Sequence, residues 1–360
     1  MAKMKVKVPT SEILFYVGSQ KDGHVSVSHL NRSLVLAQEL AGLGQEVGFL
    51  IKNDKLAKRA IKRLGFAVDM VDNPNPAYEA ALMVHSRSQV VVFDGIDLGV
   101  RIPAALNNTN KKLVVLDDTG NKRLDVDVVI NGTYAGGRYR YGRGVKETRY
   151  FLGSKYCILG PEYDDFPVRK TAATVKTLLV SLGSSDPTGM TCRVADALKD
   201  APLPFEIIYV LGPGFNKFQE LEAALNQHRS RFYFVQNPDS LAPLLVTAQL
   251  AIVSGGRACY EAARVGTPSI VIPTTGHQEL VTSALGEKLA AFPLPFAWRM
   301  PQNVFQNRLL DLLDLTSSNK KYRDRAVLEA FKLVDSQGRQ RAAQIIYSCL
   351  STQRTHEALA

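Results

Sequence analysis

Short, unbroken runs of hydrophobic residues recur along the whole chain, and amphipathic stretches separate them. The runs cover residues 12–17, 46–51, 89–94, 113–117 and 126–130 in the first half, and 177–182, 206–211, 231–235, 250–254 and 269–273 in the second. Because the runs are continuous rather than alternating, they are typical of parallel strands that helices cover on both faces. We therefore predict an α/β fold of two Rossmann-like domains facing a cleft.

A break between the two series lies at residues 160–170, where two prolines and an acidic pair interrupt any regular element. The 360 residues are enough for two separate cores. We predict an N-terminal Rossmann-like domain over residues 1–167, which carries the acceptor and catalytic side. A C-terminal Rossmann-like domain over residues 168–360 would bind the nucleotide. The amphipathic stretch 319–350 predicts two helices, which we assign to this second domain.

Charge and composition narrow the class of partner. The net charge of +10 favours phosphate-bearing ligands, and it leaves peripheral contact with an anionic membrane open. Aromatic and basic residues alternate only in the single loop 136–144, so we expect no nucleic-acid partner. No apolar run approaches the ~20 residues of a membrane span, so we expect no stable membrane insertion.

The cysteines and histidines favour a protein without metal or cofactor. The four cysteines lie far apart without a CxxC pair, which is typical of a reducing compartment. The N-terminal residues lack the apolar core of a signal peptide, so we expect a cytoplasmic protein. The six histidines show no metal-ligand spacing. Asp125 and Asp127 form an Asp-x-Asp pattern, but they precede a strand rather than end one.

The loop after the first predicted strand carries a candidate catalytic base. Residues 18–28 lead from the strand into a helix with apolar residues at i, i+4 and i+7. His29 lies near the first turn of this helix, and Arg32 lies about one turn later. A neutral imidazole there can accept a proton near pH 7, and Arg32 can bind a carboxylate or phosphate. A capping histidine is the structural alternative, and His24 is a second candidate base.

The loop after the first strand of the second series is a candidate ligand loop. Gly183 permits close approach of a ligand to the backbone, and Ser184 and Ser185 offer hydroxyl groups. Asp186, followed by Pro187, predicts a helix N-cap. The loop lacks the Gly-Lys-Ser/Thr ending of a nucleotide-hydrolysing P-loop, which disfavours an ATPase. It therefore either contacts a ligand or only caps a helix.

The most specific motif lies at residues 252–268, where a predicted strand leads through Gly255 and Gly256 into a helix. The two glycines let helix N–H groups reach a diphosphate. Glu261, about one and a half turns along this helix, is placed to accept hydrogen bonds from two ribose hydroxyls. Gln278, after the next strand, is a further polar contact for the same ligand. The pattern predicts nucleotide binding.

With these motifs the chain resembles the two-domain glycosyltransferase fold known as GT-B. Within it, the chain is similar to the UDP-2,4-diacetamido-2,4,6-trideoxy-β-L-altropyranose hydrolases of pseudaminic acid biosynthesis and to spore-coat polysaccharide biosynthesis proteins. The matching motifs are Ser28-His29-Leu30-Asn31-Arg32, Ser184-Ser185-Asp186-Pro187, and Gly255-Gly256 with Glu261. Three positions depart from the family: Ser28 replaces a glycine, Ile96 a tyrosine and His277 an asparagine.

The resemblance implies metal-independent cleavage of the anomeric bond of a UDP-linked amino sugar. His29 and Arg32 would then be catalytic, with water as the attacking group, in cell-surface glycan or nonulosonic acid biosynthesis. One alternative is an inverting GT-B glycosyltransferase, in which the attacking oxygen belongs to a sugar or lipid acceptor. A second alternative is a non-catalytic sugar-nucleotide binding protein. It is conceivable because the chain has Ile96 where the family has a tyrosine.

Overall fold

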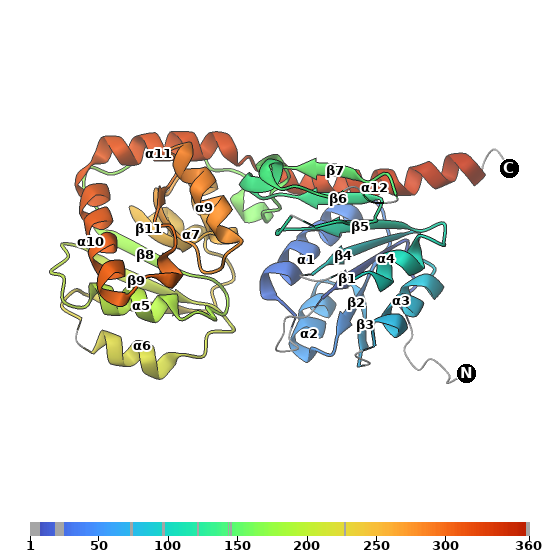
Figure 1. Cartoon of the computed structure of the whole chain (residues 1–360), viewed down its shortest axis with the longest axis horizontal. Coiled ribbons are helices and arrows are strands. Elements are labelled where there is room, and N and C mark those ends of the chain that lie inside the picture. Colours follow the sequence, from blue (N-terminus) through green and yellow to red (C-terminus); the bar gives the residue numbers. More distant parts are fainter. Residues whose placement is uncertain are drawn as a thin grey trace. The chain divides into compact units, whose positions relative to one another are not determined.

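The computed structural model describes residues 8–18, 25–72, 75–95, 98–120, 122–142, 144, 146–226 and 228–357. The chain divides into two compact units. One comprises Met1–Gly160 together with Gln337–Ala360, and the other comprises Pro161–Ser336. Each unit has its own parallel sheet (Figure 1), which confirms the fold predicted from the hydrophobic runs.

Within the described residues, the first unit has a sheet of seven parallel strands in the order β3-β2-β1-β4-β5-β6-β7. The strands are β1 (Ile13–Val17), β2 (Val47–Lys52), β3 (Ala67–Val71), β4 (Val90–Asp94), β5 (Lys112–Leu116), β6 (Val128–Asn131) and β7 (Arg149–Leu152). The five predicted strands are confirmed. The hydrophobic pattern misses β3 and β7, because these two edge strands are partly exposed and carry polar residues.

Helices cover both faces of this sheet. The helices on one face are α1 (Val27–Gly42), α2 (Lys55–Arg63) and α12 (Gly338–Glu357), and those on the other are α3 (Pro76–His85) and α4 (Arg101–Leu106). Strand β1 supplies residues alternately to the two cores. This two-sided burial is the reason that its sequence is apolar throughout.

The second unit repeats this architecture. Among its described residues, six parallel strands follow the order β10-β9-β8-β11-β12-β13. They are β8 (Thr177–Ser181), β9 (Glu206–Leu211), β10 (Phe232–Gln236), β11 (Leu250–Ser254), β12 (Ser269–Ile272) and β13 (Phe292–Pro293). The five strands predicted for this half are confirmed. The two-residue β13 is too short to leave a pattern in the sequence.

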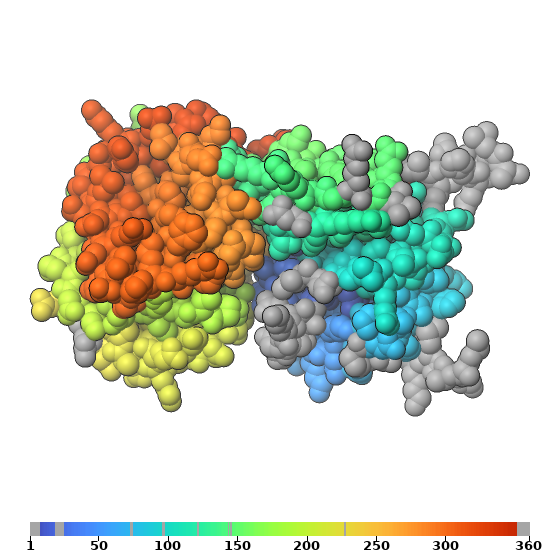
Figure 2. Space-filling model, viewed as in Figure 1, coloured from blue at the N-terminus to red at the C-terminus, as the bar shows by residue number. Residues whose placement is uncertain are grey.

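The helices of the second unit are α5 (Met190–Leu198), α6 (Phe218–Leu225), α7 (Ala242–Thr247), α8 (Arg257–Val265), α9 (Gln278–Glu287), α10 (Gln302–Ser318) and α11 (Lys320–Leu333). Short 3-10 turns are η1 (Tyr134–Arg138) and η2 (Ser154–Tyr156) in the first unit, and η3 (Pro161–Tyr163) and η4 (Ala297–Arg299) in the second. Helices α5, α6 and α10 share one core with the sheet, whereas α8 packs on β11 and β12 and against α7 and α11. Orange and red segments, α9 and α10 among them, form much of the visible surface of this unit (Figure 2).

The last helix belongs to the first unit, not to the second as we predicted. Helix α12 places Ala342, Ala343 and Ile346 in the core that it shares with α1. Gly338, its first residue, lies against Cys157, where an added Cβ would be 2.0 Å from the carbonyl oxygen. The boundary also falls after Gly160 rather than at residue 167, because η3 contacts α8. Helical periodicity predicts an amphipathic helix, but it does not say which core the helix covers.

The strand order reverses between β1 and β4 in the first sheet and between β8 and β11 in the second. In open parallel sheets, ligands bind beyond the carboxyl ends of the strands at such a switch point. The three loops singled out from the sequence follow β1, β8 and β11, so all of them begin at a switch point. Across the described ranges, no helix combines the length and the apolar character that crossing a bilayer requires.

Candidate functional site

The ends of β1 and β4 approach each other closely at the switch point of the first sheet. Gly18 N donates a hydrogen bond to Asp94 O (2.8 Å). A Cβ on Gly18 would lie 3.3 Å from Gly95 Cα, which is a tight contact between backbones. The two glycines therefore let the chain that leaves β1 pass directly beside Asp94, the last residue of β4.

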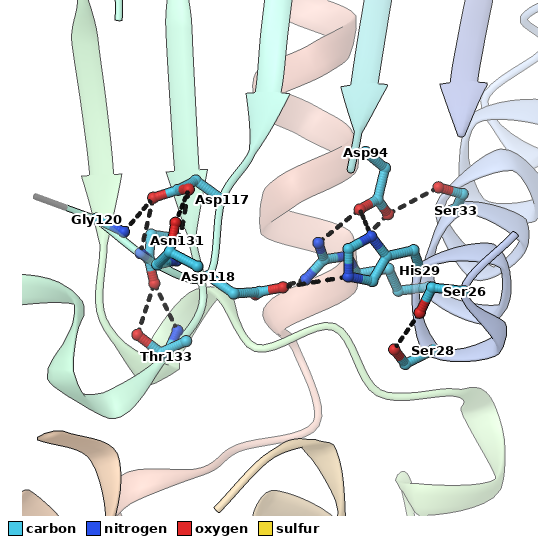
Figure 3. Close-up of polar contacts among 12 residues, drawn as sticks. Ser26, Ser28, His29, Ser33, Asp94, Asp117, Asp118, Gly120, Asn131 and Thr133 are labelled. Atoms are coloured by element: carbon cyan, nitrogen blue, oxygen red, sulfur yellow. Dashed lines mark hydrogen bonds and ion pairs between the residues drawn. The ribbon is translucent and has the colours of Figure 1, made fainter. Parts of the chain in front are cut away.

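Asp94 is fully buried and lies at the centre of a polar cluster (Figure 3). Arg32 donates to both of its oxygens, from Nε to Oδ2 (2.8 Å) and from Nη2 to Oδ1 (2.6 Å). Ser33 Oγ donates to Oδ2 (2.9 Å). A carboxylate is costly to bury unless it is paired in this way. Since both donors come from α1, Asp94 ties this helix to the end of β4.

Arg32 connects Asp94 with Asp118. Its Nη1 donates to Asp118 Oδ1 (2.6 Å). Burial lowers the pKa of Arg32, but the charges of Asp118 and Asp94 outweigh burial and raise the pKa well above its ordinary value. We predicted that Arg32 binds a carboxylate or phosphate of a ligand. In the structure, two carboxylates of the protein engage its guanidinium, so the side chain positions Asp94 and Asp118.

His29, the third residue of α1, lies between the same two carboxylates (Figure 3). Its Nδ1 faces Asp94 Oδ1 at 3.2 Å, and its Nε2 faces Asp118 Oδ2 at 3.8 Å. Nδ1 is therefore the ring nitrogen beside the fully buried carboxylate, and Nε2 is the one beside the partly exposed carboxylate. The side chain of Asp118 is 33% exposed, whereas that of His29 is 13% exposed. The pair has the geometry of a general base with an orienting carboxylate.

Two expectations from the sequence concern the surroundings of His29: that His29 only caps the helix, and that His24 is the base instead. Ser28, where the resembling family has glycine, lies with its Oγ 3.0 Å from Ser26 Oγ. The N-cap residue of α1 is Ser26, and His29 lies inside the helix. His29 is therefore not a capping residue, which was the structural alternative. His24, the second candidate base, and Ile96 lie outside the described residues.

Asp117, one residue before Asp118, belongs to a separate polar cluster. Its carboxylate accepts hydrogen bonds from Tyr141 Oη (2.7 Å) and Gly120 N (2.8 Å), and it pairs with Lys122 Nζ (2.7 Å). Burial raises the pKa of Asp117, but Lys122, Tyr141 and Gly120 together lower it below its ordinary value. With its oxygens engaged inside the protein, Asp117 holds the turn from which Asp118 projects.

In the second unit, the loop after β8 is shaped by Asp186. This residue has a left-handed backbone (φ 41°), and its buried carboxylate accepts from Met190 N (2.9 Å) and Thr191 N (2.7 Å). We predicted an N-cap with proline at the first helical position. The cap is instead Gly189, and Asp186 binds the first turn of α5 from the preceding loop. Both of its oxygens therefore serve the helix.

The three residues before Asp186 stand at the carboxyl end of β8. Gly183 is exposed with φ 112°, a conformation that glycine adopts readily. Ser184 and Ser185 are half-buried, and Ser184 O accepts a hydrogen bond from Gly214 N (2.9 Å). The loop after β9 thus packs against the loop after β8. That the loop after β8 contacts a ligand stays a prediction.

The structure brings Gly255, Gly256 and Gln278 together. A Cβ on Gly255 would lie 2.8 Å from Thr282 Oγ1, and one on Gly256 would lie 3.3 Å from Gln278 Nε2. Gln278 Oε1 accepts from Thr274 N (2.9 Å), which fixes the amide beside the glycine turn. The N-cap residue of α8 is Gly256, which has no side chain with which to cap the helix. Backbone N–H groups and one amide therefore line this turn.

Glu261 lies on the same helix but is only 6% exposed. Its Oε1 is 2.8 Å from Arg257 Nε. Burial raises the pKa of Glu261, and the positive charge of Arg257 opposes this rise. Glu261 is thus already paired inside the protein, a contact that the motif itself does not reveal.

The sequence argument missed Asp94 and Asp118 as site residues. Asp94 is the last residue of β4, and Asp118 follows β5 by two residues. An acid at the carboxyl end of a parallel strand is the signal that points to a site. Among the described residues, no three His, Cys, Asp or Glu side chains cluster in a way that could hold a metal ion. Independence from metal stays a prediction.

Comparison with known proteins adds two relatives. No protein-family model matches the chain. The chain is 31% identical over 268 residues to the uncharacterized protein MJ1062 of Methanocaldococcus jannaschii, covering 70% of this chain and 54% of that protein. It is 28% identical over 201 residues to the spore coat polysaccharide biosynthesis protein SpsG of Bacillus subtilis, covering 54% of this chain and 58% of SpsG. The chain spans little more than half the length of these curated relatives.

Solved structures match over nearly the whole chain. MurG of Acinetobacter baumannii has a TM-score of 0.66 at 14% identity, covering 94% of this chain and 100% of MurG. HepE of Anabaena in complex with UDP-glucose has a TM-score of 0.62 at 16% identity, covering 95% and 100%. This chain has the GT-B fold. In GT-B terms, the His29 cluster belongs to the N-terminal sheet and the Gly255–Gly256 turn to the C-terminal sheet.

Proposed function

We propose that this protein is a glycosyltransferase that takes a sugar from a UDP-sugar and transfers it, with inversion, to a hydroxyl group. The observation that carries the proposal is the position of His29 between the buried Asp94 and the partly exposed Asp118. A histidine oriented by a buried carboxylate on one nitrogen is equipped to take a proton on the other.

In the proposed reaction, His29 Nε2 accepts the proton of the acceptor hydroxyl while the acceptor oxygen attacks the anomeric carbon. The new bond joins that carbon to the acceptor oxygen. The bond from the anomeric carbon to the β-phosphate oxygen breaks, and UDP leaves with its electron pair. Asp94, held by Arg32 and Ser33, stabilises the imidazolium that forms on His29.

We assign nucleotide binding to the second unit. The N-terminus of α8, which begins after Gly256, and the amide of Gln278 beside Gly256 offer donors for a diphosphate. Donors fixed in this way can stabilise the charge that develops on the departing UDP. HepE, which shares the fold, is known in complex with UDP-glucose, and this supports a UDP-sugar as the donor.

Hydrolysis is the second candidate, with water in the place of the acceptor hydroxyl. It is favoured by the match of Ser28-His29-Leu30-Asn31-Arg32 to the motif of the UDP-amino-sugar hydrolases. SpsG is named for spore coat polysaccharide biosynthesis, so either reaction would fit a role in cell-surface glycan synthesis. A sugar-nucleotide binding protein without turnover is the remaining alternative.

Incubation with a panel of UDP-sugars, with and without hydroxyl acceptors, separates the three. A glycosylated product and acceptor-dependent release of UDP support the transferase. Release of UDP and free sugar without an acceptor supports the hydrolase. Thermal stabilisation by UDP without turnover supports the binding protein. The anomeric configuration of the product, read by NMR, tests inversion, and turnover in excess EDTA tests independence from metal.

A further inference from the structure

A second arginine lies where the nucleotide is proposed to bind. Arg257 is the first residue of α8 and directly follows the Gly255–Gly256 turn. The N-terminus of a helix carries partial positive charge, so a cation there is unfavourable and an anion is favourable. The first turn of α8 has no acidic residue. The guanidinium of Arg257 and the N-terminus of α8 therefore place two positive charges, one full and one partial, beside each other.

The guanidinium folds back on Glu261, one turn later, with Nε 2.8 Å from Oε1. The side chain of Arg257 is 23% exposed, whereas that of Glu261 is 8% exposed. Tyr163 and Glu162 of η3 face the same carboxylate, and the charge of Glu162 adds to the effect of burial in raising the pKa of Glu261. Arg257 thus balances the negative charge of the buried Glu261. Of the two side chains, that of Arg257 is the more exposed to solvent.

A buried hydroxyl provides an independent sign of a polar ligand at this turn. Thr282 is fully buried, and its Oγ1 has no hydrogen-bond partner in the structure described. This oxygen faces the turn, because a Cβ added to Gly255 would lie 2.8 Å from it. Buried hydroxyl groups normally have a partner. A phosphate oxygen held at the turn would supply an acceptor on this side of the molecule.

We propose that Arg257 is a diphosphate-binding residue that exchanges its partner: it gives up Glu261, with which it pairs in the structure, and binds the diphosphate of a nucleotide instead. Its departure leaves the carboxylate of Glu261 to accept hydrogen bonds from the ribose hydroxyls. The inference rests on the proposed function, since it takes a UDP-sugar as the ligand. The exchange keeps the guanidinium paired with an anion in both states.

The exchange makes a prediction that a purely structural ion pair does not. A pair that only stabilises the helix is indifferent to the number of phosphates on a ligand. A residue that binds the diphosphate discriminates between ligands that carry it and ligands that lack it. Charge-assisted hydrogen bonds to phosphate make this discrimination large.

Calorimetric titration of wild type and Arg257→Ala with UDP, UMP and uridine tests the inference. We expect Arg257→Ala to weaken UDP binding by about 10-fold or more while changing uridine binding by less than about threefold. Glu261→Gln should weaken all three ligands by a similar factor, because it acts on the ribose. Arg308→Ala, which removes an exposed charge from α10, should leave all affinities unchanged.

Two further variants guard against a folding defect. Arg257→Lys keeps the charge and should retain most of the UDP affinity, whereas Arg257→Gln keeps much of the size and should behave as Arg257→Ala. Equal weakening of UDP and uridine in Arg257→Ala, or unchanged UDP binding, overturns the inference but leaves the proposed function standing. If wild type binds no UDP at all, the proposed function fails, and the inference fails with it.

Discussion

The two candidate sites of this molecule are built by different means. In the first unit, charged side chains position one another: Asp94 accepts from Arg32 and Ser33, and His29 lies between Asp94 and Asp118. In the second unit, the backbone shapes the site: a glycine turn packs against α9, and a helix begins there without a side-chain cap.

This difference matches the demands of the two proposed tasks. A general base works only if its ring is oriented and its tautomer is fixed, and a network of side chains achieves both. A diphosphate is bound by several N–H groups at once, which requires that the backbone be bare enough for the phosphates to approach. The comparison predicts that the first site is sensitive to loss of charge and the second to added bulk.

Removal of Asp94 is the change that should do most damage. Asp94→Ala leaves Arg32 and His29 without their buried partner, and we expect a loss of about 3–5 kcal/mol in the free energy of unfolding, measured by urea denaturation. Asp118→Ala should cost clearly less, because Asp118 is partly exposed and Arg32 retains Asp94. Equal losses in the two variants would show that Asp94 does not organise the cluster.

Replacement of the base separates chemistry from binding. We expect His29→Ala to lower turnover by about 100-fold or more, because no general base then takes the proton from the attacking hydroxyl group. The affinity for UDP, measured by calorimetry, should change by less than about twofold, since the nucleotide is assigned to the other unit. A matching loss of UDP affinity would contradict the division of roles between the two units.

Bulk added to the glycine turn tests the second site. In Gly255→Ala the new methyl would meet the buried Thr282, and we expect a loss of about 1–3 kcal/mol in unfolding free energy. The new methyl of Gly256→Ala would lie 3.3 Å from Gln278 Nε2, a looser contact than the 2.8 Å at Gly255, so this variant should cost less stability and act mainly on UDP affinity. Thermal unfolding and UDP titration of both variants measure the contrast. The prediction is wrong if Gly256→Ala is the more destabilised protein.

The smallest expected effect concerns acid stability. The pKa of Asp117 is lowered in the folded protein by Lys122, Tyr141 and Gly120, against the effect of burial. A lowered pKa contributes stability that is present above the ordinary value near pH 4 and is lost as the pH falls through the folded pKa. As the pH falls below about 4, the unfolding free energy of wild type should therefore fall more steeply than that of Asp117→Asn. Urea denaturation at several pH values gives both slopes, and parallel slopes would refute this role.

Much of the fold could be predicted because strands buried on both faces leave continuous apolar runs. Ten strands predicted in this way are present, whereas the edge strands β3 and β7 escaped because their exposed residues break the run. The two helices predicted from the amphipathic stretch 319–350 are also present, as α11 and α12. The unit to which α12 belongs was not predicted correctly, because an amphipathic face carries no information about its partner.

By itself, the sequence determined the two-sheet architecture, the helix start that carries His29 and Arg32, and the turn that contains Gly255 and Gly256. These features are local: a strand, a turn and a helix start follow one another along the chain. Only the tertiary structure decided that His29 lies between Asp94 and Asp118, that Arg32 binds those aspartates, and that Arg257 pairs with the buried Glu261. The partners of His29 and Arg32 are distant in sequence, and which strand ends become neighbours follows from the strand order of the sheet. Arg257, the partner of Glu261, is close to it in sequence. Glu261 is buried, however, on a helix against which η3 packs, and this packing is a tertiary contact.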